Sequence, residues 1–159
     1  TAARSGEVRN STWSEIDLAA KMWIVPAARM KAGREHRVPL SDAAIDLLNN
    51  LPRIAGTDLV FPGSKGALSD MTLNAVMRRL GANAVPHGFR STFRDWASER
   101  TGYPSEAAEM ALAHKVTDKV EAAYRRGDLL EKRRRMMNDW AAFLVTPPAT
   151  GNVIAIKAA

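Results

Sequence analysis

The sequence predicts an α+β domain that is mainly helical, with a small antiparallel β-sheet near the N-terminus. Three short segments rich in β-branched and aromatic residues lie within the first 40 positions. From position 41 onward, apolar residues recur at the three- and four-residue spacing of amphipathic helices. The chain has 159 residues, of which 46% are hydrophobic and 25% charged, so it can bury a core of its own.

The expected sheet is formed by residues 11–18 (STWSEIDL), 21–27 (KMWIVPA) and 35–40 (EHRVPL). Valine, isoleucine, threonine and tryptophan favour extended structure in such short segments. The sequence KAGR at 31–34 contains a glycine and predicts a turn between the last two strands. We therefore expect a hairpin whose turn carries Lys31.

Two short helices are expected next, with Ser41 and Ser69 as N-cap residues. The first ends near Pro52 and the second at Gly81. Residues 59–66 between them form a short strand or a loop. The expected apolar stripe of the first helix is Ala44, Leu47, Leu48 and Leu51.

Three or four further helices are predicted between Gly88 and about position 145, with breaks at 101–104, near Lys115 and at Gly127. The basic run 132–135 (KRRR) is expected to lie mostly on a solvated face. Residues expected in the core of these helices are Phe89, Phe93, Trp96, Ala97, Ala107, Met110, Ala111, Leu130, Met137, Trp140, Ala141 and Leu144.

We expect one domain over residues 1–145, followed by a linker and a short apolar tail over residues 146–159. No run of about 18 apolar residues indicates a membrane span, and no apolar N-terminal segment indicates a secretion signal. These features predict a cytoplasmic protein. The chain has no cysteine, which excludes disulfides, thiolate metal sites and a cysteine nucleophile.

The positive charge predicts a polyanionic partner. The formal net charge is +6, and residues 78–135 hold 13 Lys and Arg against 8 Asp and Glu. Basic surfaces bind phosphate backbones through electrostatic attraction and counterion release. Within this region, His87 and Arg90 lie three residues apart at an expected helix start, where free backbone N–H groups favour an anion. For an isolated pair, a capping histidine beside a surface arginine is the commoner structure.

Five fragments of the sequence contain the remaining candidate residues. They are AARSGEV with Arg4 and Glu7, the hairpin sequence ARMKAGREHRVPL with Lys31, HGFR with His87 and Arg90, LAHKV with His114, and VEAAYRR with Tyr124. In this order the fragments resemble the catalytic domain of the tyrosine recombinases, particularly the phage-type integrases. The resemblance extends from Thr1 to about Leu144, and Tyr124 follows His114 by ten residues, as in that family.

The resemblance implies a site-specific DNA recombinase that cuts and rejoins DNA by transesterification. Tyr124 would be the nucleophile that forms a 3′-phosphotyrosyl link. Arg4 and Arg90 would clamp the non-bridging oxygens of the scissile phosphate. Lys31 would protonate the leaving 5′ oxygen.

The two histidines and an acidic residue complete the implied site. His87 would accept the tyrosine proton or hydrogen-bond the phosphate, and His114 would donate to a non-bridging oxygen. Glu7 would orient the neighbouring basic groups. We expect no metal and no other cofactor, because two arginines, a lysine and the histidines supply the positive charge.

The implied partners are duplex DNA and further copies of the chain, in a tetramer on DNA joined by the segments after about Leu129. No membrane and no small-molecule substrate is expected. Arg4 is the fourth residue of the chain, which has TAAR where the family usually has T-G-x-R. The chain therefore resembles an N-terminally truncated member.

Other functions and structural interpretations remain open for these residues. The chain could be a noncatalytic basic nucleic-acid-binding fragment, or it could relax DNA as a topoisomerase does. Taken singly, Tyr124 fits a half-buried helical tyrosine, Lys31 a turn lysine, and Arg4 with Glu7 a structural ion pair. His36 is expected on the strand surface. Four tryptophans are expected in the core: Trp13, Trp23, Trp96 and Trp140.

Overall fold

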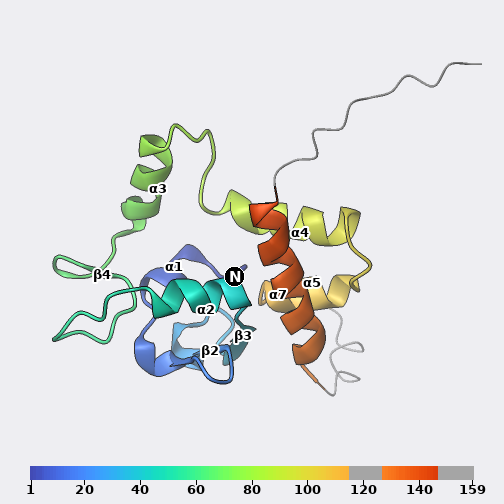
Figure 1. The fold of residues 1–159 in the computed structure, drawn as a ribbon, viewed down its shortest axis with the longest axis horizontal. Helices are drawn as coiled ribbons and strands as arrows, with labels where there is room; N and C mark the ends of the chain where they lie inside the picture. The colour runs from blue at the N-terminus through green and yellow to red at the C-terminus, as the bar shows by residue number, and fades with distance from the viewer. Residues whose placement is uncertain (115–126, 147–159) are drawn as a thin grey trace, which may run out of the picture.

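The computed structural model describes residues 1–114 and 127–146, and it confirms a mainly helical α+β fold with a small antiparallel sheet (Figure 1). No described helix is both long and apolar enough to span a membrane. The described helices are α1 (Ser5–Arg9), α2 (Asp42–Asn49), α3 (Asp70–Arg79), α4 (Gly88–Glu99), α5 (Ser105–Ala111) and α7 (Leu130–Val145), with 3₁₀ turns η1 (Trp13–Glu15) and η2 (Ala27–Arg29). The strands are β1 (Ile16–Asp17), β2 (Met22–Val25), β3 (His36–Pro39), β4 (Pro62–Gly63) and β5 (Gly66–Ala67).

The predicted sheet is present, but its first strand is shorter than expected. Strands β1, β2 and β3 pair antiparallel in that order, with Trp23 opposite Val38. The segment 11–18 contributes only Ile16–Asp17 to the sheet. The residues just before this strand form η1, because Thr12 and Glu15 make a capping box at its start. Within segment 59–66, Leu59 forms an isolated bridge with Thr12, and residues 62–66 belong to a small separate hairpin of β4 and β5.

One core lies between this sheet and α2. The Ser41 hydroxyl accepts a hydrogen bond from the Ala44 amide at 3.3 Å and so caps α2 as predicted. The helix buries Ile45 and Leu48 against the sheet. The expected stripe was wrong at Leu47, whose side chain is 55% exposed. The spacing identified a helix, but it did not specify which of two adjacent faces meets the sheet.

A second core joins α4, α5 and α7, which lie together on the right of Figure 1. It centres on Phe93, Trp96 and Trp140; the Phe93 and Trp140 rings meet edge to face with centroids 5.4 Å apart. The four tryptophans are all buried, as predicted. The predicted core was wrong at Phe89 and Leu144, which are 51% and 59% exposed.

Helix α7 also connects the two cores, because it packs against α2, α5 and β3. Arg133, within the basic run 132–135, is only 2% exposed, so the expectation of a solvated face does not hold for this residue. Its guanidinium donates to the carbonyls of Arg37 in β3 and Asp128. These bonds fix the beginning of α7 to the sheet.

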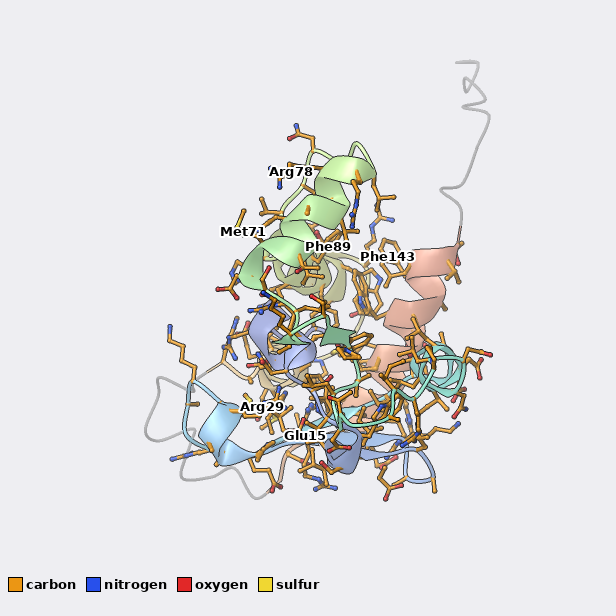
Figure 2. All side chains as sticks on the ribbon, turned by 90° about the vertical axis from the view of Figure 1, so that its left-hand side faces the viewer. Glu15, Arg29, Met71, Arg78, Phe89 and Phe143 are labelled. Atoms are coloured by element: carbon orange, nitrogen blue, oxygen red, sulfur yellow. The ribbon has the colours of Figure 1, made fainter. Side chains whose placement is uncertain are left out.

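Helix α3 has no buried residue and stands apart from the other helices in Figure 1. Figure 2 shows Met71 and Arg78 on this helix, and the Met71 side chain is 59% exposed. Ser69 is at the N-cap position, but its hydroxyl bonds the Thr72 hydroxyl at 3.1 Å instead of a backbone amide. An ion pair between Arg9 and Asp70 ties α3 to α1.

Candidate active site

Arg90 is the buried arginine of α4 and the centre of the candidate site. It is 7% exposed, and its guanidinium donates to the carbonyl oxygens of Ala2 and Leu112, the latter at 2.7 Å. Burial, followed by the nearby charge of Arg4, lowers the pKa of Arg90, although a guanidinium remains charged in proteins. The structure therefore holds a desolvated cation in one orientation.

Arg4 lies beside Arg90 and is fixed by Glu7. The Arg4 Nη1 atom is 2.8 Å from Glu7 Oε1, and the Arg4 amide donates to Glu7 Oε2 at 2.7 Å. Arg4 Nη2 also donates to the Ala113 carbonyl at 3.4 Å, next to the Leu112 carbonyl that binds Arg90. The structural ion pair is therefore present, and it directs Arg4 toward Arg90.

The turn after α5 brings His114 to these two arginines. The amides of Ala113 and His114 donate to the carbonyls of Met110 and Glu109, which is the Schellman pattern at a helix end. Ala113 has φ of 51°, a left-handed conformation that costs a non-glycine residue about 1 kcal/mol. This turn places His114 Nε2 3.4 Å from Arg90 Nη2.

The other predicted residues are not joined to this cluster by side-chain contacts in the described part of the chain. His87 is at the N-cap of α4, one turn before Arg90, and its side chain is exposed. Lys31 is exposed in the turn between η2 and β3. Tyr124 lies outside the described residues. The structure thus brings together Arg4, Glu7, Arg90 and His114.

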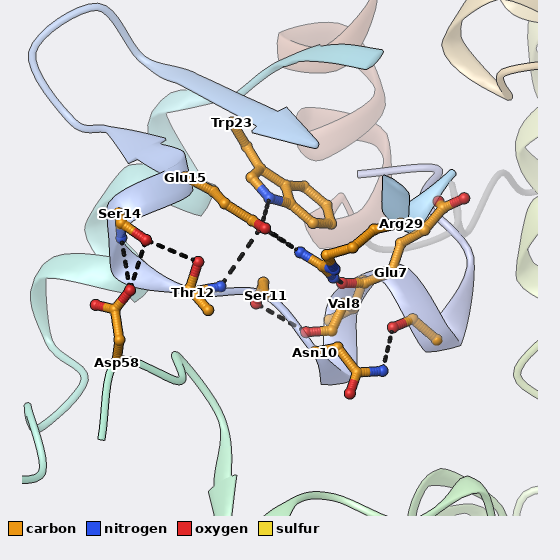
Figure 3. Close-up of polar contacts among 11 residues, drawn as sticks. Glu7, Val8, Asn10, Ser11, Thr12, Ser14, Glu15, Trp23, Arg29 and Asp58 are labelled. Carbon is orange, nitrogen blue, oxygen red and sulfur yellow. Dashed lines mark hydrogen bonds and ion pairs between the residues drawn. The ribbon is translucent and has the colours of Figure 1, made fainter. Parts of the chain in front are cut away.

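A second set of contacts attaches the hairpin to α1 and was not predicted from the sequence. Arg29, two residues before Lys31, donates to the Glu15 carboxylate and to the backbone carbonyl of Glu7 (Figure 3). Glu15 also accepts from Trp23 Nε1 at 3.0 Å. The base of the Lys31 turn is therefore fixed to the helix that carries Glu7.

His36 in β3 is half-buried, so its expected place on the strand surface was wrong. Burial, followed by the charge of Arg133, lowers the pKa of His36 to about 4. The charge of Glu7 and a hydrogen bond with the Ala111 backbone act in the opposite direction but are weaker. His36 is therefore a neutral residue that packs between the site and α7.

We predict that His36 makes the fold sensitive to acid. Its pKa of about 4 is below the 6.5 of a free histidine, so the unfolded chain binds the proton more readily. Neutral His36 makes its full contribution to the free energy of unfolding above pH 6.5, and this contribution is lost as the pH falls toward 4. At pH 4.5 we expect a loss of about 2–3 kcal/mol. Urea unfolding of the wild-type chain and His36→Gln at pH 7 and 4.5 measures this loss; equal pH dependence in both would contradict it.

Residues 1–129 match the model of the phage integrase family. Prophage integrase IntA of Escherichia coli K12 is 39% identical over 97% of this chain and 38% of its own length. The integrases of Enterobacteria phage P4 and Shigella phage Sf6 are 36% and 33% identical, each over 91% of this chain. The chain spans about two fifths of the length of these relatives.

The integrase from mycobacterium phage Brujita has a similar fold, with a TM-score of 0.63 at 20% identity over 83% of this chain and 45% of that one. The fold similarity agrees with the family match, which covers most of the chain. The resemblance seen in the sequence motifs is confirmed, and the chain belongs to the phage integrase family.

Proposed function

We propose that this chain is the catalytic part of a site-specific DNA recombinase that integrates a prophage or genomic island. The observation that carries the proposal is the pairing of Arg4 and Arg90, whose guanidiniums are fixed on adjacent carbonyls beside His114. Two fixed guanidiniums are suited to the charged oxygens of a phosphodiester. Membership in the phage integrase family and relatives named as integrases support the same function.

In the proposed reaction, the Tyr124 hydroxyl oxygen attacks the phosphorus of the scissile phosphodiester. The new tyrosyl–phosphorus bond forms as the bond between phosphorus and the 5′ oxygen breaks. His87 takes the phenolic proton, and Lys31 donates a proton to the leaving 5′ oxygen. A 5′ hydroxyl from another strand then reverses the attack, so the number of phosphodiester bonds is conserved and no ATP is consumed.

The arginines act on the charge that develops during this exchange. A phenol of pKa about 10 is a weak nucleophile at neutral pH, so the pentacoordinate phosphorus must be stabilised. Arg4 and Arg90 supply donors already fixed in place, which avoids reorganisation as charge builds on the non-bridging oxygens. His114 adds a third donor at its Nε2 atom.

Covalent trapping tests this function. The chain is incubated with a pool of nicked duplexes, in which the cut strand diffuses away and the reaction cannot reverse. We expect a DNA adduct that protease removes. Salt-sensitive DNA binding without an adduct would favour the noncatalytic binding module instead, and relaxation of supercoiled plasmid without strand exchange would favour a topoisomerase-like activity.

We propose duplex DNA and further copies of the chain as partners, assembled as a tetramer on DNA in the cytoplasm. The basic net charge of +6 supports the DNA partner. Since α7 packs into its own core, we assign the exchange between protomers to the residues after Val145. Leu144 and Val145, at the end of α7, are 59% and 77% exposed and supply apolar surface beside that segment.

Deletion of residues 146–159 is expected to weaken self-association while leaving the two cores intact. Sedimentation of the wild-type and shortened chains with and without DNA measures the change. Near-ultraviolet circular dichroism of the buried tryptophans is the control for folding. An unchanged oligomeric state would contradict the assignment.

A further inference from the structure

A chain of hydrogen bonds leads away from His114 into the junction of α4 and α5. His114 Nδ1 is 2.6 Å from Glu109 Oε2. The other carboxylate oxygen, Oε1, accepts from Arg94 Nε at 2.6 Å. Arg94 in turn donates from Nη2 to the Ser105 hydroxyl at 2.9 Å. Each oxygen of Glu109 therefore has its own partner, and the carboxylate is held from two sides.

The charge of Glu109 determines which nitrogen of His114 carries hydrogen. Burial raises the pKa of Glu109, but hydrogen bonds with His114 and Arg94, together with their charges, outweigh burial and lower it. The residue is therefore a carboxylate at neutral pH, and a carboxylate only accepts hydrogen bonds. The 2.6 Å contact then requires the hydrogen to be on Nδ1 of His114.

The backbone strengthens this constraint. The His114 amide donates to the carbonyl of Glu109 at 3.0 Å, so the two residues are joined through the main chain as well as through their side chains. With Nδ1 bound to the carboxylate, the opposite nitrogen faces Arg90, at 3.4 Å from Nη2. The imidazole therefore has one nitrogen on Glu109 and the other at the arginine pair.

We propose that Glu109, held by Arg94, is a positioning residue that keeps His114 protonated on Nδ1 and directs Nε2 toward the phosphate beside Arg90. The catalytic part of this inference rests on the proposed recombinase function. His114 must then be an imidazolium when it donates from Nε2, and the Glu109 carboxylate balances its charge. The competing interpretation is a purely structural link between α5 and α4.

Nitrogen NMR of the free chain tests the geometry without DNA. The chain has only 3 histidines, so the His114 imidazole can be assigned with one His114→Gln spectrum. We expect Nδ1 to carry hydrogen in the wild-type chain at pH 8. Glu109→Ala should remove this preference, while Glu99→Gln, an exposed change on α4, should not. A wild-type His114 with a bare Nδ1 would overturn the inference.

Single-turnover cleavage of a nicked duplex tests the role. At saturating DNA, we expect Glu109→Gln to slow cleavage about 10- to 100-fold, with the Kd for DNA changed less than about twofold. Glu109→Asp keeps the charge and should recover part of the rate, and Glu99→Gln should match the wild type. If folded Glu109→Gln cleaves at the wild-type rate, the positioning role is overturned, and Glu109 is only a structural link between α5 and α4. If the wild-type chain forms no adduct at all, the proposed function fails, while NMR still decides the protonation of His114.

Discussion

Tyr124→Phe is expected to abolish formation of the DNA adduct, with a fall of at least about 10⁴-fold in cleavage. The substitution removes one oxygen atom, the one that would bond to phosphorus, and leaves the aromatic ring in place. DNA binding should persist, because the basic groups that attract the backbone are unchanged. Cleavage is measured on a nicked duplex at saturating protein, and binding on an intact duplex of the same sequence.

Tyr103→Phe is the matched control, because the chain contains only 2 tyrosines. Tyr103 donates from its hydroxyl to Asp139 Oδ2 at 2.6 Å, and burial together with Asp139 raises the pKa of Tyr103 to about 12. Its hydroxyl is therefore hard to ionise and already bonded. We expect Tyr103→Phe to retain the adduct. An adduct formed by Tyr124→Phe and lost in Tyr103→Phe would contradict the assigned nucleophile.

Arg90→Lys is expected to reduce cleavage about 10²- to 10³-fold, even though it preserves the positive charge. The guanidinium bonds two carbonyls from distant parts of the chain, those of Ala2 and Leu112. A single ammonium group cannot span both carbonyls and also offer a planar pair of donors to phosphate. The effect should therefore be on the rate at saturating DNA more than on the Kd.

Arg100→Lys is the control for Arg90→Lys, because Arg100 follows the same helix and is exposed. Its guanidinium lies over the Phe143 ring, 5.6 Å from the ring centroid, and away from the arginine pair. The Arg100→Lys variant should cleave at the wild-type rate. Thermal unfolding of both variants separates loss of fold from loss of chemistry. A folded Arg90→Lys chain that cleaves within about twofold of the wild type would contradict the proposed phosphate clamp.

Local patterns were sufficient for the fold class and for most of the helices and strands. The hairpin of β2 and β3 and the start of α2 at Ser41 follow from β-branched residues and a capping serine. One error concerns the type of structure, because residues 13–15 form the 3₁₀ turn η1 where a strand was expected. Others concern which face of a helix is buried. Leu47 and Phe89 lie at the edge of an apolar stripe, and periodicity alone cannot decide whether such a residue meets the core or solvent.

The candidate site was predicted from motif residues, but apart from Glu7 the groups that support them were not predicted. Arg29 and Glu15 are separated by 14 residues, and Arg90 bonds Ala2 across 88, so no local spacing indicates either contact. Glu109 is five residues before His114, but their contact depends on Ala113 adopting a positive φ. A glycine there would have predicted such a turn, whereas alanine does not.

The most direct measurement is the site of attachment in the trapped DNA adduct. The adduct is digested with nuclease and then with protease, and the peptides are identified by mass spectrometry. We expect the peptide containing Tyr124 to carry a nucleotide joined through its 3′ phosphate to the tyrosine oxygen. A nucleotide on any other residue, or a link through a 5′ phosphate, would contradict the proposed recombinase chemistry.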